Sequence, residues 1–295
     1  MRRPLVLALA ALAALVSMST TRVASAQDVL VPGPGTLPPS ELRTNISVSR
    51  PYWSAGESRP FLAAIFETGG ISLRTELDAG WGRPHYSWIG GELSSSMSLR
   101  GLSAFTGVRG VLPFGSVRFG GRYVASIQQR FIDDFPKISR PMLEVDEGPR
   151  STYAALDGEV QFEIPLPVGK IGGVASAHGL FGVPDEFFVF EDALRMIAAG
   201  PFIGRGRLQY LAGIGDPPTF RVGGIVEVMG DPQREAVWFR TGPAVAVSLT
   251  HHLEAVGVAA LTLLSPDEIG LAGADLGQIG LRYRWATGDL WPEFP

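Results

Sequence analysis

The sequence has no cysteine among its 295 residues. This excludes both a disulfide-stapled secreted protein and a lipoprotein anchored through an N-terminal cysteine. After the first 26 residues there is no apolar stretch of about 18 residues, which excludes a transmembrane helix there. The spacings typical of metal sites, phosphate-binding loops and nucleophile elbows are also missing. We therefore expect neither a metal nor another cofactor.

Lysine and arginine, 25 in all, are slightly outnumbered by 29 aspartates and glutamates, but the N-terminus is basic. Arg2 and Arg3 precede an apolar run from Leu5 to Val16, and Ala24-Ser25-Ala26 has the small-x-small pattern at which a signal peptidase cleaves. The run is shorter than the ~20 residues that span a bilayer, so we interpret residues 1–26 as a cleaved export signal. Cleavage removes three arginines and no acidic residue, which takes the formal net charge from −4 to about −7. Such an acidic chain is not expected to bind nucleic acid.

Glycine is abundant instead. All 37 glycines follow residue 26, so the mature chain has about twice the usual glycine content of roughly 7%. Strands and tight turns use glycine, whereas helices tolerate it poorly. Residues 27–58 are rich in proline and serine and are predicted to form an extended periplasmic leader. Residues 59–286 are predicted to form a β-barrel, and residues 287–295 a C-terminal periplasmic tail.

The predicted barrel region alternates between apolar and polar residues with a period of two. Between Ile71 and Trp81, one face is apolar and the other carries Arg74, Glu76 and Asp78. The same pattern and the turn signals predict about 12 strands. Their ranges are 60–67, 71–81, 86–96, 101–112, 115–131, 151–165, 168–182, 204–215, 219–229, 236–249, 253–264 and 276–286. Short turns alternate with longer loops between them, which is typical of a closed antiparallel up-and-down barrel in an outer membrane.

The sequence raises three objections to this prediction. If Thr68-Gly69-Gly70 lay within one long strand, about 10 or 14 strands would compete with 12. Pro243 falls in the middle of a predicted strand, where proline removes a ladder donor. A soluble barrel or sandwich would show the same period with the apolar stripe inside. Full charges on the polar face, aromatic residues at strand ends and the segregation of loop lengths favour lipid outside.

The last predicted strand resembles the C-terminal recognition signal of bacterial outer-membrane β-barrels. Gln278, Gly280, Tyr283 and Trp285 occupy its defining positions. The chain departs from the family in having a tail after Trp285, with Phe294 next to last. The resemblance to this porin-like superfamily covers about residues 60–286. It implies a transmembrane barrel of the outer membrane that is assembled by the barrel-assembly machinery and contacts membrane lipid and lipopolysaccharide, without implying an activity.

The same superfamily includes outer-membrane phospholipases and lipid A deacylases, in which a serine and a histidine act near the outer rim. Ser176 and His178 come nearest to this, because they lie two apart on one face of a predicted strand. Neither belongs to a recognisable hydrolase motif, and the small residues around them are typical of close strand packing. His251 and His252 fall in a predicted periplasmic turn, the wrong rim for that reaction. We therefore predict no catalytic site and keep a lipid-modifying hydrolase as an alternative function.

Charged residues on the polar faces are a stronger clue. The predicted register turns these toward the lumen: Arg74, Glu76, Asp78, Arg109, Arg118, Arg122, Asp157, Glu159, Glu163, Arg207, Glu227, Arg240, Arg282 and Arg284. One interpretation is a mutually neutralising network that braces the barrel. The other is a narrow aqueous pore whose arginines attract anions. The sequence thus predicts a small passive channel or a structural barrel, with the hydrolase and a soluble periplasmic β-barrel protein as alternatives.

One predicted outer loop has a pattern of its own. Phe187, Phe190, Leu194 and Ile197 follow helical spacing, which predicts a short amphipathic helix within residues 186–199. Such a helix would fold over the mouth of the barrel or into it. An inward fold would restrict conduction. The alternative is that the same residues form a hydrophobic cluster that caps the loop.

Overall fold

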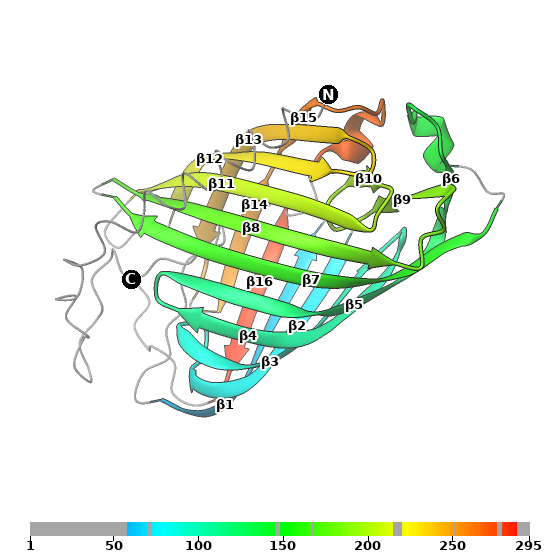
Figure 1. Cartoon of the computed structure of the whole chain (residues 1–295). Helices are drawn as coiled ribbons and strands as arrows, with labels where there is room; N and C mark the ends of the chain where they lie inside the picture. The colour runs from blue at the N-terminus through cyan, green and yellow to red at the C-terminus, as the bar shows by residue number, and fades with distance from the viewer. Residues whose placement is uncertain are drawn as a thin grey trace. The chain divides into compact units, whose positions relative to one another are not determined.

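The computed structural model describes residues 58–69, 72–144, 148–166, 168–214, 220–250, 252–275 and 279–287, all within the unit Pro39–Pro295 (Figure 1). The predicted signal peptide, the leader up to residue 57, His251, Gln278 and the tail from residue 288 lie outside the described residues. Within those ranges, no helix is long and apolar enough to cross a membrane.

The main sheet is a closed antiparallel barrel. Its strands are β1 (Arg59–Gly69), β2 (Ser72–Arg83), β3 (Ser87–Ser98), β4 (Gly101–Leu112), β5 (Gly115–Arg130), β7 (Arg150–Pro165), β8 (Lys170–Phe181), β11 (Phe202–Ile214), β12 (Phe220–Asp231), β13 (Ala236–Ser248), β14 (Leu253–Val258), β15 (Leu261–Leu264) and β16 (Gly280–Ala286). The sheet closes because β1 pairs with both β2 and β16, and β12 pairs with β13. Since β14 and β15 both pair with β13 as two parts of one strand, the barrel has 12 strands, and the predicted fold class is confirmed.

The first hairpin resolves the question of strand number. β1 and β2 are separate antiparallel strands, with Thr68 opposite Leu73. The chain therefore reverses direction after Gly69, as the turn prediction required. The alternatives of about 10 or 14 strands are excluded with it.

The strand that pairs with β13 is interrupted next to Pro243. Thr241 pairs with Leu261 and Ala244 pairs with Val258, so the break between β14 and β15 lies opposite the proline. A proline inside a strand lacks the amide donor of a regular ladder and is accommodated at such an irregularity. The barrel therefore tolerates Pro243 by a local break without losing a strand.

The two faces of the barrel wall differ sharply in chemistry. Leu73, Phe119 and Leu281 are 44%, 52% and 43% exposed on the outer face. Glu76 and Asp157, on the opposite face of their strands, are buried. A soluble barrel would enclose the apolar side chains and expose the charged ones. The observed arrangement is the reverse, as in barrels that face lipid.

The connections at the two rims differ as well. The connections β2–β3, β4–β5, β7–β8, β11–β12 and β13–β14 lie at one end, which we call the short-turn rim. The opposite end, the long-loop rim, carries loops with small elements of their own. These elements are β6 (Ile132–Asp133), the 3-10 helix η3 (Arg140–Glu144), β9 (Phe187–Glu191), β10 (Met196–Ala198) and the 3-10 helix η4 (Gly270–Gly273).

The predicted helix within residues 186–199 is wrong. This segment forms the hairpin β9–β10, in which Met196 pairs with Glu191 and Ala198 pairs with Val189. β9 also pairs with β6 of another loop. Nearly all of its side chains are buried, so contacts on both faces determine the conformation and override the helical spacing.

Candidate functional site in the barrel interior

The hairpin β9–β10 packs against the inner face of the barrel wall near the long-loop rim (Figure 1). Four of its residues, Val189, Leu194, Met196 and Ala198, belong to one buried apolar cluster with the wall. The wall contributes Val124, Tyr153, Ala155, Leu180, Ile203, Met229, Ala236 and Trp238 from β5, β7, β8, β11, β12 and β13. The hairpin therefore occupies the lumen on this side of the barrel.

The other face of the hairpin packs against neighbouring long loops. A second buried cluster joins Phe188, Phe190 and Ile197 to Ile132, Ile138 and Ile269. These residues come from three connections that are far apart in the chain. Together they form a packed layer on the outer side of the hairpin.

A buried carboxylate fixes the hairpin to the wall. Glu191 is fully buried and accepts hydrogen bonds from Arg122 Nη1 at 2.8 Å and from the Tyr153 hydroxyl. Burial alone would raise the pKa of Glu191, but the charge of Arg122 and the hydrogen bonds from Arg122 and Tyr153 hold it below its usual value. Glu191 is thus held as an ionised anchor.

A second anchor is centred on Glu227, a fully buried residue of β12. Its carboxylate pairs with Arg205 at 2.8 Å, Arg207 at 2.6 Å and Arg240 at 3.0 Å. Arg240 also donates to the carbonyl oxygens of residues 194–195 at 2.7 and 2.6 Å. The barrel wall therefore binds the hairpin both through the side chain of Glu191 and through the backbone carbonyls of residues 194–195.

Ser176, His178 and Asp157 form a continuous hydrogen-bonded series on the inner wall. Ser176 Oγ lies 2.9 Å from His178 Nε2, and His178 Nδ1 lies 2.8 Å from Asp157 Oδ1. Each of the three residues is 8% exposed. Asp157 Oδ2 also accepts from Arg122 Nε at 2.6 Å, which links the series to Glu191 and the hairpin.

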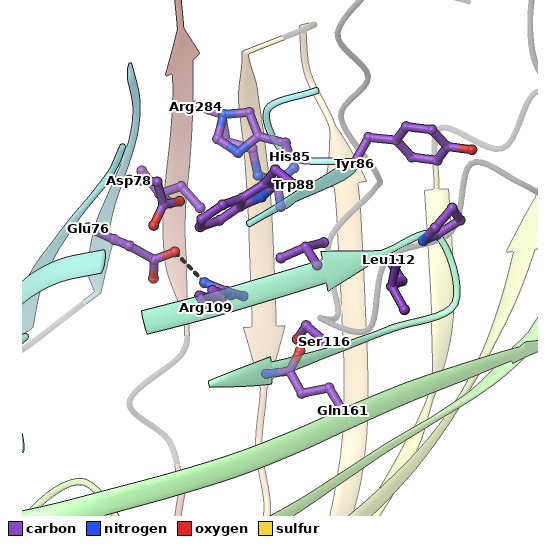
Figure 2. A pocket seen from close by; sticks show the side chains of 13 residues that line it. Glu76, Asp78, His85, Tyr86, Trp88, Arg109, Leu112, Ser116, Gln161 and Arg284 are labelled. Atoms are coloured by element: carbon purple, nitrogen blue, oxygen red, sulfur yellow. Dashed lines mark hydrogen bonds and ion pairs between the residues drawn. The ribbon is translucent and has the colours of Figure 1, made fainter. Parts of the chain in front are cut away.

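A third charged group lies on β2 to β5, and Figure 2 shows three of its residues, Glu76, Asp78 and Arg109. Arg109 pairs with Glu76 at 2.7 Å and with Glu92 at 3.4 Å, and Arg118 pairs with Glu92 at 2.6 Å. Carboxylate oxygens of Glu76, Asp78 and Glu92 lie within 4.8 Å of one another, which is close enough to share a cation. Because the two arginines already neutralise Glu76 and Glu92, we do not assign a metal site to this group.

His85 lies in the turn between β2 and β3 and lines a pocket at the short-turn rim (Figure 2). Its Nε2 atom is 3.1 Å from the carbonyl oxygen of Trp285. Burial and the nearby charge of Arg284 lower the pKa of His85 to about 4. The folded barrel therefore favours the neutral imidazole.

Replacing His85 with asparagine should reduce the loss of stability in acid. Between pH 6.5 and pH 4 the unfolded chain binds a proton at this residue and the folded chain does not. The stability of the wild type therefore decreases as the pH is lowered through this range. Asparagine does not titrate and tolerates the positive φ of 60° at this position. Urea midpoints at pH 7.5 and 4.5 should drop further for the wild type than for His85→Asn. Equal drops would show that the pKa of His85 is not lowered.

The remaining predicted lumen charges also lie on the inner face. Arg74 pairs with Glu76, Arg282 with Glu67, Arg284 with Glu254, and Glu163 with Lys170, while Glu159 accepts from Gln161. Sequence reasoning missed the partners Glu67, Glu92, Lys170, Glu191, Arg205 and Glu254. All of these except Glu191 lie on strands in phase with the inward positions, and that phase was the available signal. Glu191 ends β9, a short strand within a long loop, and the alternation of the barrel strands does not assign its face.

The described turn and insertion-signal residues lie on β16 or against it. His252 Nδ1 is 2.8 Å from the carbonyl oxygen of Arg284, and its ring stacks on Tyr283. Tyr283 and Trp285 are half-exposed on the outer face of β16. Gly280 begins β16 opposite Gly69.

No protein-family model and no curated protein matches the sequence. Similar solved structures include a loop L8 deletion mutant of OmpT, an outer membrane protein of Vibrio cholerae, with 10% identity, TM-score 0.33, and coverage of 78% of this chain and 98% of that one. The trimer form of in-vitro folded OmpT has 10% identity, TM-score 0.30, and coverage of 78% and 98%. A mutant of the Rh. blastica porin has 7% identity, TM-score 0.25, and coverage of 77% and 100%. The chain's own strand pairing and its apolar outer face give it the architecture of the porin-like outer-membrane barrels that the sequence resembles.

Proposed function

We propose that the protein is an integral barrel of the bacterial outer membrane and a narrow passive channel whose outer mouth is restricted by the hairpin β9–β10. Half-exposed apolar side chains on the outer wall suit hydrocarbon, and ion-paired charges on the inner wall suit an enclosed space. Delivery by the predicted export signal, insertion by the barrel-assembly machinery and contact with lipopolysaccharide belong to the same proposal.

The position of the hairpin carries the proposal of restricted conduction. Its apolar residues share one buried cluster with the wall, and Glu191 is tied to Arg122 and Tyr153. A water-filled bore of full width is incompatible with this packing. The inward arginines are matched by carboxylates, so the lumen charges support bracing more than strong selection of anions.

The lipid-hydrolase alternative receives little support from this geometry. Ser176 and His178 face the interior, whereas lipid acyl chains would lie against the outer face of the barrel. The soluble periplasmic alternative would require the apolar side chains to be enclosed. Many of them, including Phe119, Ile89 and Leu263, are more than half exposed instead.

Freeing the hairpin should increase conductance. In the double variant Tyr153→Phe and Glu191→Gln, the hairpin loses its charged anchor while the volumes of both side chains are kept. Single-channel recording in planar bilayers should show small or rare steps for the wild type, and steps several-fold larger or more frequent for the variant. Glu268→Gln is the matched control, because it removes an exposed loop ion pair with Lys137. If neither protein conducts, the channel proposal is wrong. If both conduct alike, the hairpin does not restrict the channel.

A further inference from the structure

We propose that Ser176, His178 and Asp157 form a hydrolytic triad in the lumen that cleaves small, water-soluble carboxylic esters. The two hydrogen bonds of 2.9 and 2.8 Å have the order that such a triad needs, from serine oxygen to histidine Nε2 and from histidine Nδ1 to carboxylate. β7 and β8 hold the three side chains in place, since Asp157 is the direct cross-strand partner of His178. This proposal goes beyond conduction and requires only that water and small molecules reach the lumen.

One tautomer of His178 fits both contacts. With the proton on Nδ1, the imidazole donates to Asp157, and its Nε2 accepts from the Ser176 hydroxyl. In the hydrolytic step, His178 takes the serine proton and becomes an imidazolium. The Asp157 carboxylate, whose Oδ1 lies 2.8 Å from His178 Nδ1, stabilises this positive charge as it forms.

The reaction balances with water as the only co-reactant. Ser176 Oγ forms a bond to the acyl carbon, the ester carbon–oxygen bond breaks, and His178 passes the serine proton to the departing alkoxide. Water then attacks the acyl-serine and gives its proton to His178. The acid leaves, and the proton returns to Ser176.

The developing oxyanion has a cationic neighbour on the next strand. Arg205 of β11 is the cross-strand partner of Ser176, and both side chains point to the interior. Cross-strand partners have Cβ atoms about 4.5–5.5 Å apart, so Arg205, although paired with Glu227 at 2.8 Å, is a cation close to an oxyanion formed at Ser176. Backbone amides of the ladder are already bonded to neighbouring strands, which leaves this role to a side chain. The buried position excludes a lipid in the membrane as substrate.

The test is covalent labelling of the folded barrel in detergent with a small fluorophosphonate, which reacts with activated serines. The wild type should be labelled at Ser176, as located by peptide mass spectrometry, and should hydrolyse p-nitrophenyl acetate. His178→Ala should lower the labelling rate by about 10²- to 10⁴-fold, the usual contribution of a general base. Ser176→Ala should abolish it. Ser126→Ala is the matched control, because Ser126 is an inward serine of similar burial that bonds only to the carbonyl of Gln129 among the described contacts.

Two further measurements make a negative result decisive. Heat-modifiable gel migration reports whether each variant is folded, and near-isosteric Ser176→Ala keeps the comparison valid if His178→Ala does not fold. Because the chain has no cysteine, Ser176→Cys provides a single thiol whose reaction with a small methanethiosulfonate reports access to this position. If that thiol reacts but wild-type Ser176 is not labelled, the serine is not activated. If the thiol does not react, no substrate reaches the site. Either result overturns the proposal.

Discussion

Replacing Glu227 with alanine should destabilise the barrel by about 3–5 kcal/mol, the typical cost of removing one partner from a buried ion pair. Three arginines, Arg205, Arg207 and Arg240, converge on this one carboxylate. Without it, the positive charges repel one another in the barrel interior. Arg240, which is 1% exposed, would keep only neutral acceptors on its guanidinium. Urea unfolding in lipid vesicles, followed by tryptophan fluorescence, measures the loss.

Two variants serve as comparisons. One tests whether the charge of Glu227 or its volume is needed, and the other measures the effect of breaking an exposed ion pair. Glu227→Gln keeps the shape and removes the charge, so it should retain most of the effect. Glu144→Ala also breaks an arginine–glutamate pair, the one between Arg140 and Glu144. Both side chains of this pair are mostly exposed, and exposed pairs contribute at most about 1 kcal/mol. Equal urea midpoints for Glu227→Gln and the wild type would show that the arginines do not depend on this charge.

The barrel was predictable because most of its strands alternate between apolar and polar residues and because its two faces meet different media. A period of two assigns each residue of a strand to one face, so Leu73 and Glu76 were correctly placed outside and inside. The three longest connections then identified one rim, although the turns at residues 99–100 and 232–235 of that rim are short. The same reasoning located the inward charges, because a charged residue in phase with an inward position has no other place on the wall.

The hairpin could not be predicted from its own sequence. Phe187, Phe190, Leu194 and Ile197 satisfy a helical repeat, yet the segment is buried on two sides by elements far away in the chain. Strand pairing with β6 and packing on the wall then decide its conformation. Local periodicity carries no information about such partners, since it assumes that only one face of an element is buried.

For a related reason, the sequence predicted only part of the candidate site. Ser176 and His178 are two apart on one strand, so their shared face follows from the sequence alone. Asp157 is 21 residues from His178, and Glu191 is 69 residues from Arg122. Bringing these pairs together requires the register between strands and the path of a loop. Neither is determined by alternation, because shifting a pair of strands by two residues preserves the pattern.

Replacing Gly280 with alanine should prevent or strongly slow closure of the barrel. Gly280 pairs with Gly69 where the last strand meets the first, and an added Cβ atom there would lie 1.7 Å from the carbonyl oxygen of Thr68. The backbone of β1 must shift to make room, and overpacking of this kind typically costs about 1–3 kcal/mol. In Gly121→Ala, the matched control, the added atom would meet nothing within 4 Å.

Gly280 is also a residue of the predicted insertion signal, so its replacement could act through a steric clash or through lost recognition by the assembly machinery. A direct test distinguishes these two causes. A steric defect at the seam between β1 and β16 should appear when the purified, urea-unfolded chain is folded into lipid vesicles without any assembly machinery. Gly280→Ala should then yield less of the heat-modifiable folded form than the wild type or Gly121→Ala. If Gly280→Ala folds normally in vesicles but fails in cells, the glycine is needed for recognition by the machinery. The close approach of Thr68 would then not limit closure.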